Sequence, residues 1–367
     1  MGERRALVMV EDPELLDAVL RLAAAAGCEL HRTVDAADAR RHWTDAPLVL
    51  LDPPAAQRCA RGRMPRRDSV VVAVRGEPPP TVWEQAVAVG AEHVVSLPDA
   101  EPWLVSAFAE AAEGARGAGP VLAVVGGRGG AGASVLAAAV AIQAAQDGSR
   151  ALLIDCDPLG GGLDLVLGAE DVQGLRWPDL AVAGGRVPAA ALHAALPAPA
   201  TGRYRGCELA VLSCDRSARG PAASAVSAVV EAGRRAGETV VCDLPRYPTD
   251  AALAALHAAD LTVLVVPAEV RSCAAAGRVA AVLAEQTGAV HVVVRGPAPG
   301  GVAAEEVAAA LGLPLLTTMR PEPGLARALE RGAPPDRPRG PLAGAARAVL
   351  AALRAGVGTT SAGVETS

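Results

Sequence analysis

The stretch VLAVVGGRGGAGAS, residues 121–134, decides the fold of this chain. Its apolar start, Val121–Val125, predicts a buried strand, and the apolar run at 135–145 predicts a helix. A glycine-rich loop between a strand and a helix is the setting in which P-loops bind phosphate. The pattern G-x-x-x-x-G-K-[ST] holds from Gly127 to Ser134, except that Ala133 replaces the lysine. The stretch therefore predicts a pocket shaped for a nucleotide, and the missing lysine predicts weakened nucleotide hydrolysis.

Backbone amides and one hydroxyl carry the chemistry expected of this loop. Successive N–H groups converge on one anion, glycines allow the close approach, and the N-terminus of the following helix adds positive charge. The hydroxyl of Ser134 stands where P-loops coordinate Mg²⁺. The predicted nucleotide-binding residues of the loop are Gly127, Arg128, Gly129, Gly130, Ala131, Gly132, Ala133, Ser134 and Val135. A plain strand-to-helix turn without a ligand is the alternative.

Acidic residues close two further predicted strands. Asp155 and Asp157 end the strand at 150–157, and Asp243 lies near the end of the strand at 239–245. Ligands of open parallel sheets bind outside the carboxyl ends of the strands, so these carboxylates are expected beside the loop. We predict that Ser134, Asp155 and Asp243 hold Mg²⁺. We also predict that Asp155 and Asp157 are catalytic and orient an attacking water. Any one of these residues alone is also typical of a cap or turn.

Apolar runs alternate with helical patterns along most of the chain, which predicts two α/β units with parallel sheets. The first unit is expected at 1–116, a linker at 117–120, and the P-loop unit at 121–355. The predicted strands are 6–10, 48–52, 70–74 and 92–97, then 121–126, 150–157, 208–214, 239–245, 261–267 and 291–296. The segment 341–355 predicts a final amphipathic helix, and 356–367 predicts a disordered tail.

Residues 121–355 resemble the MinD/ParA superfamily of deviant Walker A ATPases, most closely its CpaE/TadZ branch. The loop RGGAGAS at 128–134 is similar to the family pattern K-G-G-x-G-K-[ST], and the stretch LLIDCDPLGGGLDLVLG at 152–168 is similar to its switch segment. The resemblance implies ATP or ADP with Mg²⁺, a homodimer in which Arg128 reaches the partner's nucleotide, and Arg295 near the adenine. Because Ala133 carries no charge for the phosphates, we expect turnover ~10²–10³ lower, hence at most a weak ATPase with weakened nucleotide binding.

Residues 6–114 resemble a receiver domain with a flavodoxin-like fold, as the CpaE branch carries. Glu11 and Asp12 stand where receivers hold an acidic Mg²⁺ pair, and Asp52 stands at the phospho-acceptor position. Arg75 and Leu97 replace the hydroxyl and the lysine that receivers use. We therefore favour a degenerate receiver used for docking over a phosphorylation switch. A simple strand-end cap is a third interpretation of Asp52.

Composition narrows the classes of function. The net charge of −6, the scarcity of aromatic residues and the lack of a long basic tract give no clear nucleic-acid signal. No apolar run approaches about 18 residues, so no membrane span is expected, although peripheral membrane association stays open. Acidic residues near the N-terminus are unlike a secretory signal, so we expect a cytoplasmic protein. The cysteines and histidines show no ligand spacing, which predicts neither disulfides nor a transition-metal site.

The segments 175–197 and 210–216 resemble the septum site-determining (Ssd) group of CpaE-like proteins, found in helicase/secretion gene neighbourhoods. This resemblance implies a regulator of septum placement, or of pilus or secretion machinery at the cell pole, with partners in that machinery. The alternative is an active ParA/MinD-type ATPase whose nucleotide-driven dimer associates with DNA or membrane. For the helix at 341–355, packing against the sheet is favoured over membrane binding.

Overall fold

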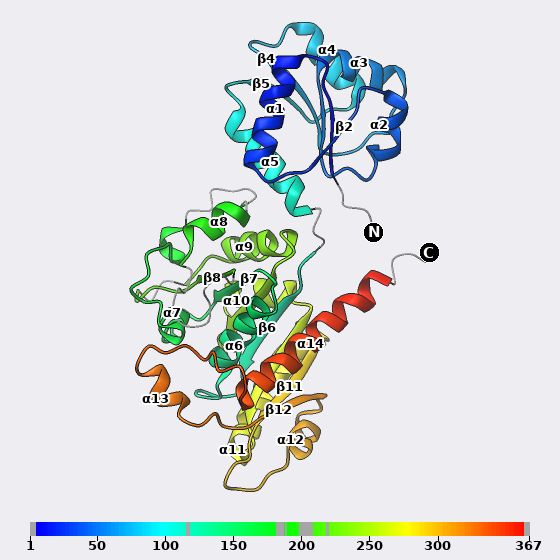
Figure 1. Cartoon of the computed structure of the whole chain (residues 1–367). Coiled ribbons are helices and arrows are strands. Elements are labelled where there is room, and N and C mark those ends of the chain that lie inside the picture. Colours follow the sequence, from blue (N-terminus) through cyan, green and yellow to red (C-terminus); the bar gives the residue numbers. More distant parts are fainter. Residues whose placement is uncertain are drawn as a thin grey trace. The chain divides into compact units, whose positions relative to one another are not determined.

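The computed structural model describes residues 5–114, 118–180, 187, 189–197, 208–217 and 220–362. The segment 175–197, which carries part of the Ssd resemblance, therefore lies partly outside the described residues. The chain divides into two compact units, Met1–Ala118 and Gly119–Ser367, at a point inside the linker predicted for 117–120. Each unit is built on a parallel sheet with helices (Figure 1), which confirms the predicted fold class.

The first unit is a five-stranded parallel sheet in the order β2-β1-β3-β4-β5, the flavodoxin-like arrangement. Its strands are β1 (Ala6–Met9), β2 (Leu30–Arg32), β3 (Val49–Leu51), β4 (Val70–Arg75) and β5 (His93–Leu97). Its helices are α1 (Pro13–Ala25), α2 (Ala36–Trp43), α3 (Pro53–Arg61), α4 (Pro80–Val89) and α5 (Glu101–Gly114). Apolar residues of α1 and α5 form the core on one face, and those of α2, α3 and α4 form it on the other.

The second unit is a seven-stranded parallel sheet in the order β12-β11-β10-β6-β9-β7-β8. Its strands are β6 (Val121–Gly126), β7 (Ala151–Asp155), β8 (Leu209–Leu212), β9 (Thr239–Leu244), β10 (Leu261–Pro267), β11 (Val290–Arg295) and β12 (Leu315–Met319). Its helices are α6 (Ala133–Gln146), α7 (Leu163–Leu167), α8 (Ala189–Ala195), α9 (Ala223–Arg235), α10 (Asp250–Ala258), α11 (Val270–Ala284), α12 (Ala304–Leu311), α13 (Leu325–Leu329) and α14 (Pro341–Ala362). The central strand β6 alternates between two cores, since Leu122 and Val124 face α6 while Val121 and Val125 face the opposite layer.

The helix α6 that follows the glycine loop is apolar on all sides, which is typical of a buried helix. It packs on β6, β7 and β9 and against α14, which itself contacts β12. The side chains Leu342, Val349, Leu350 and Leu353 of α14 are buried in the same core. This packing is the role favoured for the C-terminal helix. No helix among the described residues has the length and apolar character needed to cross a bilayer.

Two differences from the expected elements occur at the margins of the fold. The strands β2 and β12 were not predicted, because both lie at sheet edges and their half-buried residues form no long apolar run. The helix α14 continues through Ala362, beyond the end at 355 that was predicted for it, and 363–367 lie outside the described residues. Isolated glycines cost a helix only about 1 kcal/mol each, which does not stop a helix anchored by packed turns.

Candidate functional site

The loop between β6 and α6 presents a row of free backbone amides. Gly130 and Gly132 have φ of 70° and 99°, values that favour glycine, and these let the chain turn back into the start of α6. In the described part of the chain, the N–H groups of Gly129, Gly130, Gly132, Ala133 and Ser134 donate to no protein acceptor. Because free amides at a helix N-terminus attract negative charge, this loop has the geometry of an anion-binding site.

Gly127, which is predicted to bind nucleotide, has contacts inside the protein. Its N–H already donates to the carbonyl of Val265 at 2.9 Å, and it does not line the cavity described below. A Cβ at this position would lie 2.7 Å from the Cβ of Ala276 on α11. The glycine therefore allows the loop to pack against α11, and the structure does not place it against a ligand.

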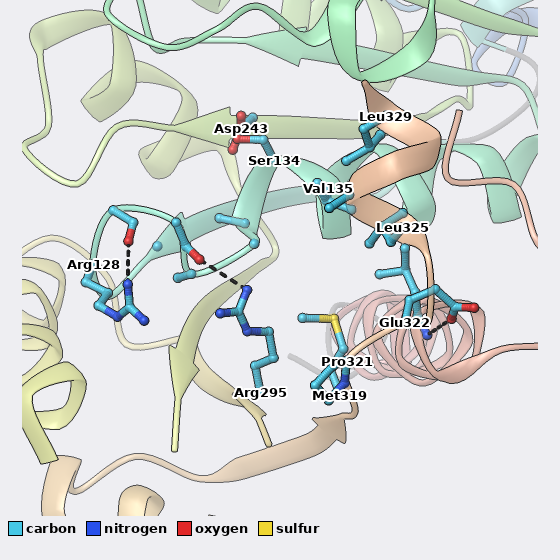
Figure 2. Close-up of a pocket in the computed structure, with 18 of the residues that line it drawn as sticks. Arg128, Ser134, Val135, Asp243, Arg295, Met319, Pro321, Glu322, Leu325 and Leu329 are labelled. Carbon is cyan, nitrogen blue, oxygen red and sulfur yellow. Dashed lines mark hydrogen bonds between the residues drawn. The ribbon is translucent and has the colours of Figure 1, made fainter. Parts of the chain in front are cut away.

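A cavity of about 660 Å³ opens above the loop, a size typical of small-ligand sites. Figure 2 shows Ser134 and Asp243 together at one end, and Leu325 and Leu329 of α13 at the other, with Val135 between them. The further lining residues are Gly126, Arg128 to Ala133, Asp157, Leu244, Arg246, Arg295, Met319 to Glu322, Ala326 and Leu342. One end is therefore polar and rich in N–H donors, while the other is largely apolar.

The polar end pairs a hydroxyl with a buried carboxylate. Val125 pairs with Leu244 across β6 and β9, and this register brings Asp243 beside the first turn of α6. The hydroxyl of Ser134 lies beside Asp243 and favours the charged form of its carboxyl group. Burial raises the pKa of Asp243 to about 8, and the nearby Ser134 hydroxyl opposes the shift. A hydroxyl and a carboxylate beside an anion-binding site are oxygen ligands of the kind that Mg²⁺ takes in P-loop proteins.

Asp155, for which a metal-binding and catalytic role is predicted, does not line the cavity. Its side chain is 2% exposed and accepts hydrogen bonds from the amides of Asp157, Leu163 and Cys214 at 3.0, 3.2 and 3.3 Å. The hydroxyl of Ser213 donates to it as well, at 3.3 Å. Because both carboxylate oxygens are used inside the protein, Asp155 organises the segment after β7. Asp157, by contrast, lines the cavity.

A second buried carboxylate, which sequence analysis missed, supports the same segment. Asp164 is 4% exposed and pairs with Arg176 at 3.4 Å and with Arg216 at 3.2 Å. It also accepts a hydrogen bond from Ser213 at 3.3 Å, so Ser213 joins the two buried carboxylates. No local motif marks these pairs, since the partners come from distant parts of the sequence.

Four arginines line the cavity, and two of them already have partners in the protein. Arg128 donates to Ser272 at 2.7 Å and pairs with Glu269 at 3.1 Å, both of which lie in the same subunit. Arg295, expected near the adenine, donates to the carbonyl of Gly130 at 3.1 Å and so lies over the loop (Figure 2). Arg246 and Arg320 are exposed, and no contact with another described residue occupies their guanidinium groups. These two, which sequence analysis did not single out, follow the ends of β9 and β12.

The three acidic residues predicted for a receiver site, Glu11, Asp12 and Asp52, all have hydrogen-bond or ion-pair partners within the first unit. Asp52 is 1% exposed, caps α3 through the amide of Ala55 at 2.9 Å, and accepts the amides of Glu11 and Asp12. Asp12 caps α1 and pairs with Arg75 at 2.8 Å. Glu11 pairs with Arg58. Arg75, in place of the receiver hydroxyl, thus neutralises Asp12, while Arg58 neutralises Glu11. Asp52 has the contacts of a strand-end cap.

Two family models match the chain and together cover nearly all of it. One, the CobQ/CobB/MinD/ParA nucleotide binding domain, matches residues 122–335, more than half of the chain. The chain belongs to this nucleotide-binding family. The other, the Rv3660c-like, CheY-like N-terminal domain, matches residues 9–119 and confirms the receiver-like fold of the first unit.

Relatives and solved structures agree with this assignment. The chain is 50% identical over 355 residues to "Uncharacterized protein Rv3660c" of Mycobacterium tuberculosis, covering 95% of this chain and 98% of that protein. MinD of Aquifex aeolicus is 25% identical with a TM-score of 0.52, over 64% of this chain and 97% of that one. The septum site-determining protein MinD complexed with Mg-ADP from Pyrococcus horikoshii has a TM-score of 0.53 at 18% identity, over 63% and 94%. At 18% identity, the similarity to the Pyrococcus horikoshii structure shows the fold alone.

Proposed function

We propose that the second unit binds a nucleoside di- or triphosphate with Mg²⁺ and hydrolyses it feebly or not at all. The observation that carries this proposal is the row of free amides beside the Ser134–Asp243 pair, with Ala133 at the position of the lysine. The amides and Mg²⁺ ligands support binding, since they do not depend on the missing cation. The missing cation and the occupied carboxylate of Asp155 both count against turnover.

Arg246 supplies the positive charge that the loop lacks. It follows Leu244 by two residues, and Leu244 pairs with Val125 of the strand that leads into the loop. Arg246 lines the cavity together with Asp243 and Asp157, and its guanidinium group is exposed. An arginine in this position binds a phosphate oxygen by charge-assisted hydrogen bonds. The apolar end, with Met319 and Leu325, accepts the base.

The cellular role is that of a MinD/CpaE-like spatial regulator, acting in septum placement or in the polar placement of pilus or secretion machinery. The receiver-like unit, with its acidic residues neutralised, serves as a docking domain. Dimerisation through the nucleotide face is supported by Leu159, Tyr247 and Val270, which are 84%, 86% and 74% exposed and follow β7, β9 and β10. Exposed apolar groups of this size at one end of a sheet favour a contact with another protein surface.

Two measurements on the purified chain test the nucleotide proposal. Calorimetry with Mg-ADP and Mg-ATP is expected to show one site, and phosphate release is expected to stay near the uncatalysed level. The Ala133→Lys variant is expected to bind more tightly. Robust turnover in the unaltered chain that the Ala133→Lys change leaves the same would contradict the proposal, and so would a lack of nucleotide binding by both proteins.

The alternative, an active ATPase that associates with DNA or membrane, has less support. The apolar side of α14, with Val349 and Leu353, is buried against α6 and is not exposed to a bilayer. Sedimentation with anionic vesicles discriminates between the readings. Pelleting that requires ATP would favour the membrane-associated ATPase, whereas recovery in the supernatant with and without nucleotide is expected here.

A further inference from the structure

Two histidines and an aspartate of the first unit come together at the edge of its sheet. His31 on β2 and Asp38 and His42 on α2 offer three ligand atoms that all lie within 4.8 Å of one another. The Nε2 atom of His31 lies 2.9 Å from Oδ2 of Asp38, and Nε2 of His42 lies 4.0 Å from Oδ1. The two rings also pack with their centroids 4.0 Å apart. The expectation that the histidines have no acidic ligand partner is therefore wrong for this pair.

The local fold explains the convergence. Asp38 and His42 are four residues apart on α2, so their side chains share one face of the helix. The start of α2 is fixed by Asp35, whose side chain accepts the amide of Ala37 at 3.0 Å. β2 is an edge strand that pairs only with β1, with His31 opposite Leu7. The cluster thus joins the edge strand to the helix that follows it.

We propose that His31, Asp38 and His42 form a site for one borderline divalent transition-metal cation, with Zn²⁺ as the probe. Two imidazole nitrogens and one carboxylate oxygen are a ligand set that suits zinc and its neighbours, whereas Mg²⁺ and Ca²⁺ prefer oxygen ligands throughout. Ligands 2.0–2.2 Å from a tetrahedral metal are ~3.4 Å apart, so the cluster needs only a small closure. His42 is half exposed and closes the site by side-chain rotation.

Charge and exposure set the character of this site. The side chain of Asp38 is 24% exposed and lies against both imidazoles, so a cation can reach its carboxylate oxygens from solvent. Arg41 also pairs with Asp38, at 2.7 Å, and competes with the metal for Oδ1. Its side chain is 72% exposed and swings into solvent without loss of packing. The fourth ligand is water, because the cluster lies at the surface. The metal acts as a clip between α2 and β2.

Zinc titration of the chelator-treated full chain tests the proposal. We expect one equivalent of Zn²⁺ bound, a rise in melting temperature, and no comparable response to Mg²⁺. His31→Gln and His42→Gln are each expected to weaken the affinity at least tenfold, and Arg41→Ala to strengthen it. His93→Gln is the matched control, since His93 lies in the same unit with its ring against Trp103.

Circular dichroism of each variant shows whether the unit is folded, and His42→Gln, at a half-exposed position, gives a readout if His31→Gln unfolds. Absence of stoichiometric zinc binding by the unaltered chain would overturn the proposal. Zinc binding that persists unchanged when His31→Gln and His42→Gln are combined would overturn it too, because the zinc would then be held elsewhere, for instance by cysteines. These outcomes are independent of nucleotide binding by the second unit.

Discussion

Replacing Arg246 with alanine asks whether a guanidinium group from a neighbouring strand stands in for the lysine of the glycine loop. Arg246 lines the cavity beside Asp243 and is exposed, whereas Arg128 is held by Glu269 and Ser272. If Arg246 contacts phosphate, its loss removes one of two lining arginines without a partner among the described residues, the other being Arg320, which follows a different strand. The Arg246→Ala variant is therefore expected to bind Mg-ADP more weakly while its fold is unchanged.

The expected size follows from the strength of hydrogen bonds to charged groups. Such bonds contribute ~1.5–3 kcal/mol, and exposure of Arg246 to solvent argues for the lower end of that range. Since 1.4 kcal/mol corresponds to tenfold in affinity, the Kd for Mg-ADP should rise about tenfold. In an Ala133→Lys background the same change should matter less, because the lysine takes over part of the phosphate charge.

Fluorescence titration with a labelled ADP in 50 and 200 mM salt measures this effect. Arg278→Ala is the matched control, since Arg278 is an exposed arginine on α11 that does not line the cavity. The affinity loss in Arg246→Ala should shrink as salt rises, because screening weakens an exposed charge pair. If Arg246→Ala binds Mg-ADP as tightly as Arg278→Ala and the unaltered chain, the reasoning is refuted.

Four further outcomes follow from the contacts. Glu269→Gln should release Arg128 and increase the nucleotide-dependent dimer fraction in analytical ultracentrifugation; an unchanged fraction would show that the pair does not restrain dimerisation. Gly127→Ala, whose Cβ would lie 2.7 Å from that of Ala276, should destabilise the second unit by ~1–3 kcal/mol in urea, whereas Gly129→Ala, with open space around it, should not. Without Mg²⁺, the melting temperature should fall between about pH 4 and pH 8, since the folded state keeps a proton on Asp243 that the unfolded chain releases; Asp243→Asn should remove this part of the decline, and an unaltered pH profile would contradict it. Acetyl phosphate should leave Asp52 unlabelled, and Asp52→Ala should destabilise the first unit by ~1–2 kcal/mol through the lost cap; stoichiometric labelling would restore the phosphorylation switch.

The central strands and the glycine loop could be predicted because their signals are local. Five of the strands of the second unit are central, buried on both faces, and appear in the sequence as continuous apolar runs. The loop has a glycine pattern fixed by backbone geometry, and two of its glycines do adopt left-handed conformations. Edge strands such as β12 have a weaker apolar pattern. Because β12 was not predicted, the residues after it that line the apolar end of the cavity were not predicted either.

What could not be predicted depends on partners far apart in the chain. The spacing of Asp38 and His42 is visible in the sequence, but the third ligand, His31, comes from a strand whose position only the fold gives. Likewise Gly127 matches the motif, yet a glycine is needed there because the Cβ of Ala276, more than a hundred residues away in the chain, leaves no room for a side chain. Motif spacing locates a residue on an element, whereas its role is decided by what the neighbouring element places against it.

Asp155 shows the same point with consequences for turnover. The register between β7 and β9 puts Asp155 next to Asp243, at the strand end where P-loop proteins hold catalytic carboxylates. Ser213 and Cys214, just after β8, turn its oxygens away from the cavity by hydrogen bonds of 3.3 Å each. Ala133, at the lysine position, lies on α6, whereas the hydrogen-bonded carboxylate of Asp155 lies on β7. The Ala133→Lys change therefore adds the cation but does not free this carboxylate. The variant should therefore gain affinity for nucleotide far more than it gains turnover, because a lysine holds phosphate but does not orient the attacking water.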